Sequence, residues 1–342
     1  MIRRFDRDGE RWRVKLVISI PALLALAAWA AACLWIDGPA SRLLAGLLAL
    51  GFSLSALLVL IIVRPIWRMW LFFALLFIGV QAWWLGIEPS NDRNWLPDVA
   101  RPPAARFNGD LVTIENVRNF HYRSETDYDE RWETRTFDLS KLCGIDMFLS
   151  YWGSPMIAHT ITSWAFDDGQ HLAVSIETRK EEGEEYSAVL GFFRQFELYY
   201  VAADERDLIR LRTNHRGEDV YLYRLETPLP LARALLIDYL EEMNRLAERP
   251  RWYNALTHNC TTTIRRHVRQ VAPRNPFSWK ILVNGYIDEL GYDRGTIDTS
   301  LPFEELRRRS AISEKGLAAG HVRDYSRLIR EGLPGVDRCS AD

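Results

Sequence analysis

Apolar residues are concentrated at the start of the chain, and three stretches there contain no Asp, Glu, Lys or Arg. They are residues 16–36, 43–63 and 69–87. Each is close to the roughly 20 residues that a helix needs to cross the hydrocarbon core of a bilayer. The pattern therefore predicts a membrane anchor at 1–87 with three transmembrane helices.

A cleaved signal is the main alternative for the first stretch, because Ala30–Cys33 resembles a lipoprotein cleavage site. Two further apolar stretches follow directly, however, and three such segments are difficult to bury in a soluble fold. We therefore favour three spans over cleavage.

Basic residues between and before the spans set the expected orientation. Six of them precede the first span, and Arg64 and Arg68 lie between the second and the third. The positive-inside rule then places the N-terminus in the cytoplasm and everything after residue 87 on the other side. We expect a bacterial inner-membrane protein with a periplasmic C-terminal domain.

The polar part of the chain changes character along its length. Several prolines in 88–109 indicate an extended linker, and the last residues, 291–342, favour a helical C-terminal extension. Between them, the region 110–290 begins with short β-branched and aromatic runs and continues with helical patterns at 231–246 and from Cys260 onward. This order predicts an α+β domain. We expect strands at 111–114, 132–139, 146–152, 161–166, 172–176, 196–201 and 220–225.

Asp168-Gly169 predicts a β-hairpin, because this dipeptide favours tight turns between strands. A two-residue loop would pair His159 with Thr178, whereas a three-residue or bulged loop would pair it with Glu177. Either register brings the Glu177 carboxylate within one residue of the histidine.

Cys260 is the strongest candidate for chemistry. The polar run before it gives way to Ile264, Val268 and Val271 at helical spacing, so Cys260 is expected to open a helix. Unpaired N–H groups and the positive end of the helix dipole favour a thiolate at this position. A structural alternative is that Cys260 is a small apolar residue of the helix stripe.

Thiol catalysis also needs a base and a group that orients it. His159 lies at the start of a predicted strand, and a strand histidine facing a helix-start cysteine is the papain arrangement. Glu177 is the candidate for the third position, with Asp167 or a backbone carbonyl as alternatives. A core histidine and a solvent-facing carboxylate are the corresponding structural interpretations of His159 and Glu177.

Other site types have weaker support. His258, Cys260 and His267 lack the spacing of a zinc site, and the chain contains no CxxC. No phosphate-binding glycine motif and no basic stripe with interleaved aromatics is present, so we expect no cofactor, no metal and no nucleic-acid partner. Cys143 and Cys339 can pair in an oxidising compartment, which would leave Cys260 as the unpaired thiol outside the membrane.

Several separated motifs resemble the Lnb N-terminal periplasmic domain family. They lie between about Asn94 and Leu290 and include 166–172, 175–179, 192–195, 252–254 and 259–262. The resemblance implies a permuted papain-like (NlpC-type) thiol fold, in which the histidine strand precedes the cysteine helix, as in lecithin:retinol acyltransferase. The order His159 then Cys260 is consistent with it.

The resemblance also implies an activity. Family members are similar to a lipoprotein N-acyltransferase that moves an acyl chain from a phospholipid to the α-amine of a lipoprotein. Cys260 would then carry the acyl group as a thioester, with His159 as base and acid and Glu177 in the third position. In the acyltransferase members the membrane helices follow the catalytic domain, whereas here three precede it, which leaves the acceptor open.

Two other functions stay open on the sequence. The same chemistry serves a cysteine peptidase or amidase that acts on cell-wall peptides, with water resolving the acyl-enzyme. A non-enzymatic envelope protein that uses the fold for binding is the third. The expected partners are thus membrane phospholipid and either lipoprotein N-termini or cell-wall peptides.

Overall fold

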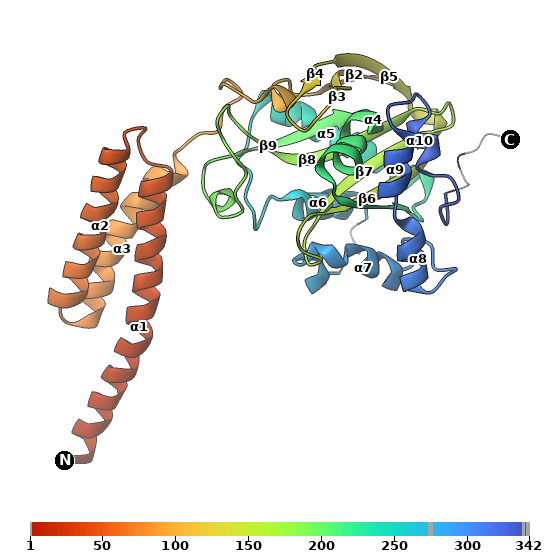
Figure 1. The fold of residues 1–342 in the computed structure, drawn as a ribbon. Helices are drawn as coiled ribbons and strands as arrows, with labels where there is room; N and C mark the ends of the chain where they lie inside the picture. The colour runs from red at the N-terminus through yellow and green to blue at the C-terminus, as the bar shows by residue number, and fades with distance from the viewer. Residues whose placement is uncertain (1, 273–275, 337–338, 340–342) are drawn as a thin grey trace. The chain divides into compact units, whose positions relative to one another are not determined.

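Three long helices come first in the chain (Figure 1). The computed structural model describes residues 2–272, 276–336 and 339. Within them, three helices are long and apolar enough to cross a membrane: α1 (Ile2–Ile36), α2 (Arg42–Ile62) and α3 (Ile66–Leu85). They correspond to the three apolar stretches of the sequence.

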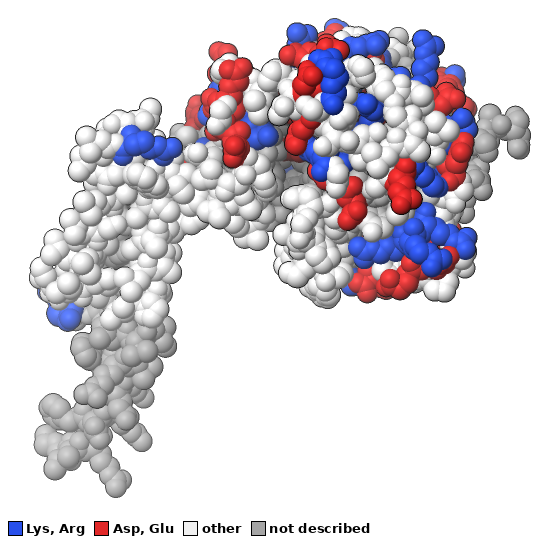
Figure 2. Space-filling model, in the orientation of Figure 1, with Lys and Arg blue, Asp and Glu red and all other residues white. Residues whose placement is uncertain are grey.

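The helices bury few side chains against one another and expose many apolar ones. Leu23, Phe52 and Phe73 belong to a small core between them, while Leu58 and Ile61 are more than half exposed. Figure 2 shows that the described surface of α1 to α3 is almost free of charge. An apolar outer surface of this kind is suited to lipid, because lipid chains take the place of a protein core around it.

The segment Ser187–Gln195 belongs to the same compact unit as the three helices, Met1–Pro89. Asp37, just after α1, accepts hydrogen bonds from the backbone N–H of Arg194 at 3.1 Å and from Gln195 Nε2 at 2.7 Å. Phe193 stacks on Trp29 with ring centroids 5.1 Å apart. This segment is therefore held by both polar and aromatic contacts.

The second unit comprises Ser90–Tyr186 and Phe196–Asp342. In its described part, eight strands form one mixed sheet in the order β1-β2-β9-β8-β7-β6-β10, with β5 paired to β2. Its strands are β1 (Ala104–Asn108), β2 (Leu111–Arg118), β5 (Trp132–Asp138), β6 (Leu142–Tyr151), β7 (Ala158–Phe166), β8 (His171–Arg179), β9 (Glu197–Ala203) and β10 (Asp219–Arg224). A small separate hairpin consists of β3 (His121–Tyr122) and β4 (Tyr128–Asp129).

Helices cover both faces of the sheet. Trp164 of β7 donates to the carbonyl of Ala232 in α5 (Leu229–Glu248) at 3.0 Å. Ile161 lies three residues earlier, hence on the opposite face, and shares a core cluster with Leu208 of α4 and Ile329 after α10. The remaining helices are α4 (Glu205–Arg210), α6 (Cys260–Val271), α7 (Ile287–Asp293), α8 (Phe303–Ser310), α9 (Ser313–Ala319) and α10 (Tyr325–Leu328).

The α+β class predicted from the sequence is confirmed, and each of the seven predicted strands is present. Residues 88–109, expected to be an extended linker, also contain a 3-10 turn at Pro97–Val99 and the edge strand β1. The short β1 run escaped the pattern analysis because only one of its five side chains, Ala105, is buried.

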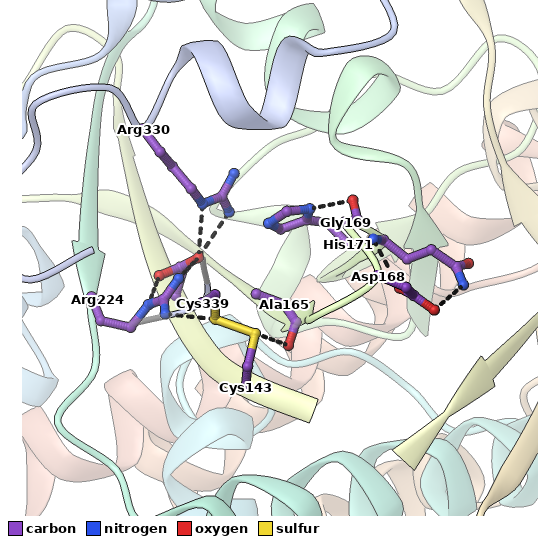
Figure 3. The surroundings of a disulfide bond; sticks show 10 residues. Cys143, Ala165, Asp168, Gly169, His171, Arg224, Arg330 and Cys339 are labelled. Atoms are coloured by element: carbon purple, nitrogen blue, oxygen red, sulfur yellow. Dashed lines mark hydrogen bonds and ion pairs between the residues drawn. A yellow bond between two sulfur atoms is a disulfide. The ribbon is translucent and has the colours of Figure 1, made fainter. Parts of the chain in front are cut away.

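Cys143 of β6 and Cys339 near the C-terminus form a disulfide, so the open question about this pair is resolved (Figure 3). The two cysteines are 196 positions apart in the sequence. Beside them, the buried Arg330 pairs with Asp146 at 2.8 Å and with Glu205 at 2.6 Å. The C-terminal segment is thus held against the sheet by a covalent bond and by buried ion pairs.

Replacing both cysteines, Cys143→Ala with Cys339→Ala, is expected to lower the free energy of unfolding by about 2–4 kcal/mol, because the unfolded chain regains the entropy of a long open loop. Thermal unfolding of the full chain in detergent, followed by fluorescence with and without reductant, measures it. Cys33→Ala is the control. Reductant should lower the midpoint of the control but not that of the double variant; a midpoint of the control that ignores reductant would contradict the prediction.

Candidate functional site

Cys260 is the first residue of α6, as the sequence predicted. Asn259 is the N-cap: its side chain accepts from the backbone N–H of Thr262 at 2.9 Å, and the Thr262 hydroxyl accepts from the N–H of Asn259 at 3.0 Å. This capping box defines where the helix starts. The cap binds the N–H of Thr262 and leaves those of Cys260 and Thr261 without a partner in the helix. The positive end of the helix dipole therefore lies at the half-buried thiol and favours its anionic form.

His159 and Glu177 meet because of the hairpin register. Ile161 pairs with Ser175, and Ala165 pairs with His171. The loop between the strands has three residues, Asp167 to Gly169, with Gly169 at φ 80°. Continuing the register by two residues places His159 opposite Glu177, and His159 Nε2 lies 3.2 Å from Glu177 Oε1. Of the two registers considered from the sequence, the three-residue loop is the one present.

Two residues that the sequence analysis missed complete this arrangement. Ser175 Oγ lies 2.6 Å from His159 Nε2 and donates to Glu177 Oε1 at 2.6 Å. The nearly buried Arg212 donates to the same oxygen at 2.9 Å. Ser175 and Glu177 both lie next to Nε2 of His159. Nδ1 is therefore the nitrogen that can take a proton from Cys260.

The charges of these groups reinforce one another. Burial lowers the pKa of His159, but the Glu177 carboxylate and the hydrogen bond to Cys260 outweigh it and raise the pKa to about 9. Burial raises the pKa of Cys260, but the hydrogen bond from His159 and its charge hold that pKa below its ordinary value. Burial also opposes ionisation of Glu177, yet His159 and Arg212 keep its pKa well below the usual range. These shifts favour a thiolate–imidazolium pair over a neutral thiol beside a neutral imidazole.

Asn284 links the histidine strand to the cysteine helix. Its Nδ2 donates to the carbonyl of Ala158 at 2.6 Å and to Thr261 Oγ1 at 2.7 Å, and its Oδ1 accepts from the N–H of Ala158 at 3.0 Å. The same nitrogen lies 4.0 Å from Cys260 Sγ. Both hydrogens of this amide are thus used to hold the two elements together. The donors left for an oxygen on a carbon attached to the sulfur are the backbone N–H groups of Cys260 and Thr261 at the start of α6.

The other histidines and carboxylates considered from the sequence do not join this site. Asp167 is exposed in the hairpin loop, so Glu177 and not Asp167 contacts His159. His267 is buried between Tyr200 and Asp238, with both ring nitrogens at 2.6 Å from these partners. No group of three or more His, Cys, Asp or Glu placed to hold a metal ion occurs among the described residues.

The sequence pattern gave little signal for three residues of the site, Ser175, Arg212 and Asn284. Ser175 is an ordinary inward-facing residue of a strand, and Arg212 lies in a helical segment far along the chain. Asn284 begins a short 3-10 turn, Asn284–Tyr286, in a mostly apolar segment. Only the i, i+2 spacing of Ser175 and Glu177 on one strand face offered a usable signal.

A comparison with family models tests the resemblance seen in the sequence. Residues 128–285 match the family described as Lnb N-terminal periplasmic domain. The part of the chain that matches is thus similar to the family that the separated sequence motifs resemble. The matched range contains Cys260, His159 and Glu177 as well as Asn284. Comparisons with curated proteins and with solved structures found no match. The Lnb N-terminal periplasmic domain and the three apolar helices together fit an inner-membrane anchor with a periplasmic domain.

Alkylation of Cys260 by iodoacetamide should follow a pH profile with a midpoint below that of an ordinary thiol, about 8.5. Glu177→Gln removes the negative charge that favours imidazolium, so the pKa of His159 falls, the thiolate loses its partner, and the midpoint moves up by about one unit. Mass spectrometry of the Cys33→Ala protein follows the reaction. Glu304→Gln, an exposed carboxylate of α8, should leave the profile unchanged; equal profiles for both variants would refute the coupling.

A substitution at Gly285 tests how the loop before β7 positions His159. A Cβ at this position would lie 2.2 Å from the carbonyl oxygen of Pro155 and 2.6 Å from the carbonyl carbon of Met156. Gly285→Ala must therefore displace backbone, and we expect a loss of about 1–3 kcal/mol in unfolding free energy together with slower alkylation of Cys260 at pH 7. Thermal unfolding and mass spectrometry measure these effects. At Gly291 the nearest atoms lie 3.4 Å away, so Gly291→Ala is the neutral control.

Proposed function

We propose that this protein is a membrane-anchored, cysteine-dependent acyltransferase of the periplasm, which takes an acyl chain from a phospholipid and passes it to an amine. The N-terminus of a lipoprotein is the proposed acceptor. The observation that supports this most directly is the contact of His159 with both Glu177 and the thiol of Cys260 at the start of α6.

The arrangement supports a permuted papain-like site as part of the proposal. Cysteine at a helix start, histidine on a strand and a group that orients the ring are the parts that thiol acyl transfer needs. Here the histidine strand β7 precedes the cysteine helix α6 in the chain. The match of residues 128–285 to the Lnb N-terminal periplasmic domain family is consistent with this order.

In the first half of the proposed reaction, the Cys260 thiolate attacks the carbonyl carbon of a phospholipid ester. The oxygen that gains charge accepts hydrogen bonds from the backbone N–H groups of Cys260 and Thr261 at the start of α6, while Asn284 holds this helix start against β7. The C–O bond then breaks, and His159 gives its Nδ1 proton to the departing alkoxide. The products are a Cys260 thioester and a lysophospholipid, and neutral His159 stays oriented by Ser175 and Glu177.

In the second half, an amine attacks the thioester carbon. Neutral His159 accepts the proton that the nitrogen loses, the C–S bond breaks, and Cys260 leaves as the thiolate. The products are an amide and the original thiolate–imidazolium pair. Transfer to water by the same steps would release a fatty acid, so the acceptor, not the histidine, distinguishes a transferase from a hydrolase.

Three membrane-capable helices favour a lipid donor over a soluble one. The helices keep the domain on a bilayer, where the concentration of phospholipid around the enzyme is high. A cell-wall peptidase would gain less from this anchor, because its substrate is not in the bilayer. The family description also mentions the periplasm, where both phospholipid of the outer leaflet and lipoproteins are accessible.

The test uses the full chain in phospholipid vesicles with a diacylglyceryl-cysteine peptide as acceptor. Intact mass should show a hydroxylamine-labile acyl adduct on wild-type protein and none on Cys260→Ala. His159→Ala should slow adduct formation by about 10²- to 10⁴-fold, because general base and acid catalysis is lost. His258→Ala, which removes a histidine close to Cys260 in sequence, is the matched control and should retain the wild-type rate.

The acceptor separates the possible outcomes. Acylated peptide supports the transferase. Free fatty acid with unmodified peptide, or cleavage of muropeptides by the same protein, would identify a hydrolase and contradict the transfer step. Wild-type protein that forms no adduct with any of these substrates would contradict both enzymatic functions.

A further inference from the structure

Three loops that lead into the candidate site expose apolar side chains. The loop 152–157 ends at β7, just before His159, the turn 253–259 ends at Cys260, and the segment 276–286 contains Asn284. We call six of their side chains the apolar rim. They are Met156, Ile157, Leu256, Phe277, Trp279 and Leu282, and each is between 51 and 60% exposed.

Contacts hold two of these loops side by side. The N–H of Gly285 donates to the carbonyl of Met156 at 3.0 Å. The side chain of Asn284 forms hydrogen bonds with both the N–H and the carbonyl of Ala158. The third loop, 253–259, leads directly into α6. A residue of α6, Arg265, contacts the segment 276–286, because its guanidinium lies 5.6 Å from the ring centroid of Phe277. The rim thus lies around residues that contact the thiol of Cys260, and is not scattered over the domain.

The three loops carry almost no charge. They contain no Asp, Glu or Arg, and their one lysine is Lys280. Its ammonium pairs with Glu289 at 3.2 Å and Asp293 at 2.6 Å. Figure 2 shows the surface over the β6–β7 loop in white, whereas the neighbouring surface over α8 carries both signs of charge. Monomeric soluble proteins rarely leave such an apolar patch in contact with water.

We propose that the apolar rim docks into the outer part of a phospholipid bilayer, so that Cys260 opens toward lipid. A bilayer is the occupant that the rest of the chain supports, because three helices of the same protein are able to span one. Trp and Phe beside aliphatic residues are typical of surfaces that enter the membrane interface. The docking itself does not require any reaction; its role in delivering the acyl donor rests on the proposed function.

Site-directed fluorescence tests the docking in the full chain. The protein carries Cys33→Ala and Cys260→Ala, keeps its disulfide, and receives one new cysteine, Ile157→Cys, labelled with an environment-sensitive fluorophore. In vesicles we expect blue-shifted emission that is quenched by phospholipids brominated in their acyl chains. Leu317→Cys is the matched control, since Leu317 lies on α9 and is 56% exposed, close to the 55% of Ile157.

The outcomes distinguish the occupants of the rim. A blue shift without quenching would show that protein, for example a second copy of the chain, covers Ile157, and would overturn the proposal. An unshifted label at Ile157 would overturn it as well, and so would quenching that is equal at Ile157 and Leu317. Because Cys260 is absent from this protein, these results do not depend on catalysis. The proposed function is tested separately, by acylation of Cys260.

A second experiment tests whether docking delivers lipid. Ile157→Asp with Leu282→Asp places two charges in the rim of otherwise wild-type protein, and Leu317→Asp with Val322→Asp does the same elsewhere. Acylation of Cys260 by vesicle phospholipid should fall by about tenfold or more in the rim variant, while acylation by a soluble p-nitrophenyl ester stays close to the wild-type rate. Equal losses with both donors, or no loss with either, would contradict the proposal.

Discussion

The contact between His159 and Glu177 depends on one residue of hairpin register. Side chains alternate between the two faces of a strand, so a shift by one position would place Thr178 opposite His159 and turn Glu177 to the other face. The three-residue loop with Gly169 in the left-handed region sets the register that is present. The charge on His159, and through it the low pKa of Cys260, follows from this turn.

Burial makes the arrangement costly unless every charge has a partner. Glu177 accepts from Ser175 and Arg212, and Arg212 also donates to the carbonyl of Leu208. These contacts compensate the desolvation of the carboxylate and of the guanidinium. The same solution appears elsewhere in the domain, where Arg330 lies between Asp146 and Glu205 beside the disulfide. Paired buried charges thus anchor both the candidate site and the C-terminal segment.

The anchor, the site and the apolar rim are consistent with work at a lipid surface. Three helices with exposed apolar faces need a bilayer around them, and the loops that deliver His159, Cys260 and Asn284 expose apolar side chains with little charge. A reactive thiolate also benefits from this setting, because a low local dielectric strengthens its pairing with imidazolium. In the proposed function, one apolar surface serves both binding of lipid and protection of the acyl-enzyme.

The sequence by itself determined the elements with a strong local or periodic signal. Runs without charge predicted three helices, and β-branched and aromatic runs predicted seven strands. The polar run before Cys260 predicted the start of α6. Each of these signals depends on neighbours within a few residues. The resemblance to the Lnb N-terminal periplasmic domain family could also be recognised from separated motifs. Cys260, His159 and Glu177 were candidates for the same reason: each has an informative local context.

Only the tertiary structure decided which of these residues meet. It set the hairpin register, which differs by one residue between the two turns that the sequence allows. It brought Arg212 and Asn284 to the site from segments 35 and 24 residues away from Glu177 and Cys260. It also joined Cys143 to Cys339 across 196 residues. Such contacts depend on the packing of distant elements, which leaves no periodic or local mark on the amino-acid sequence.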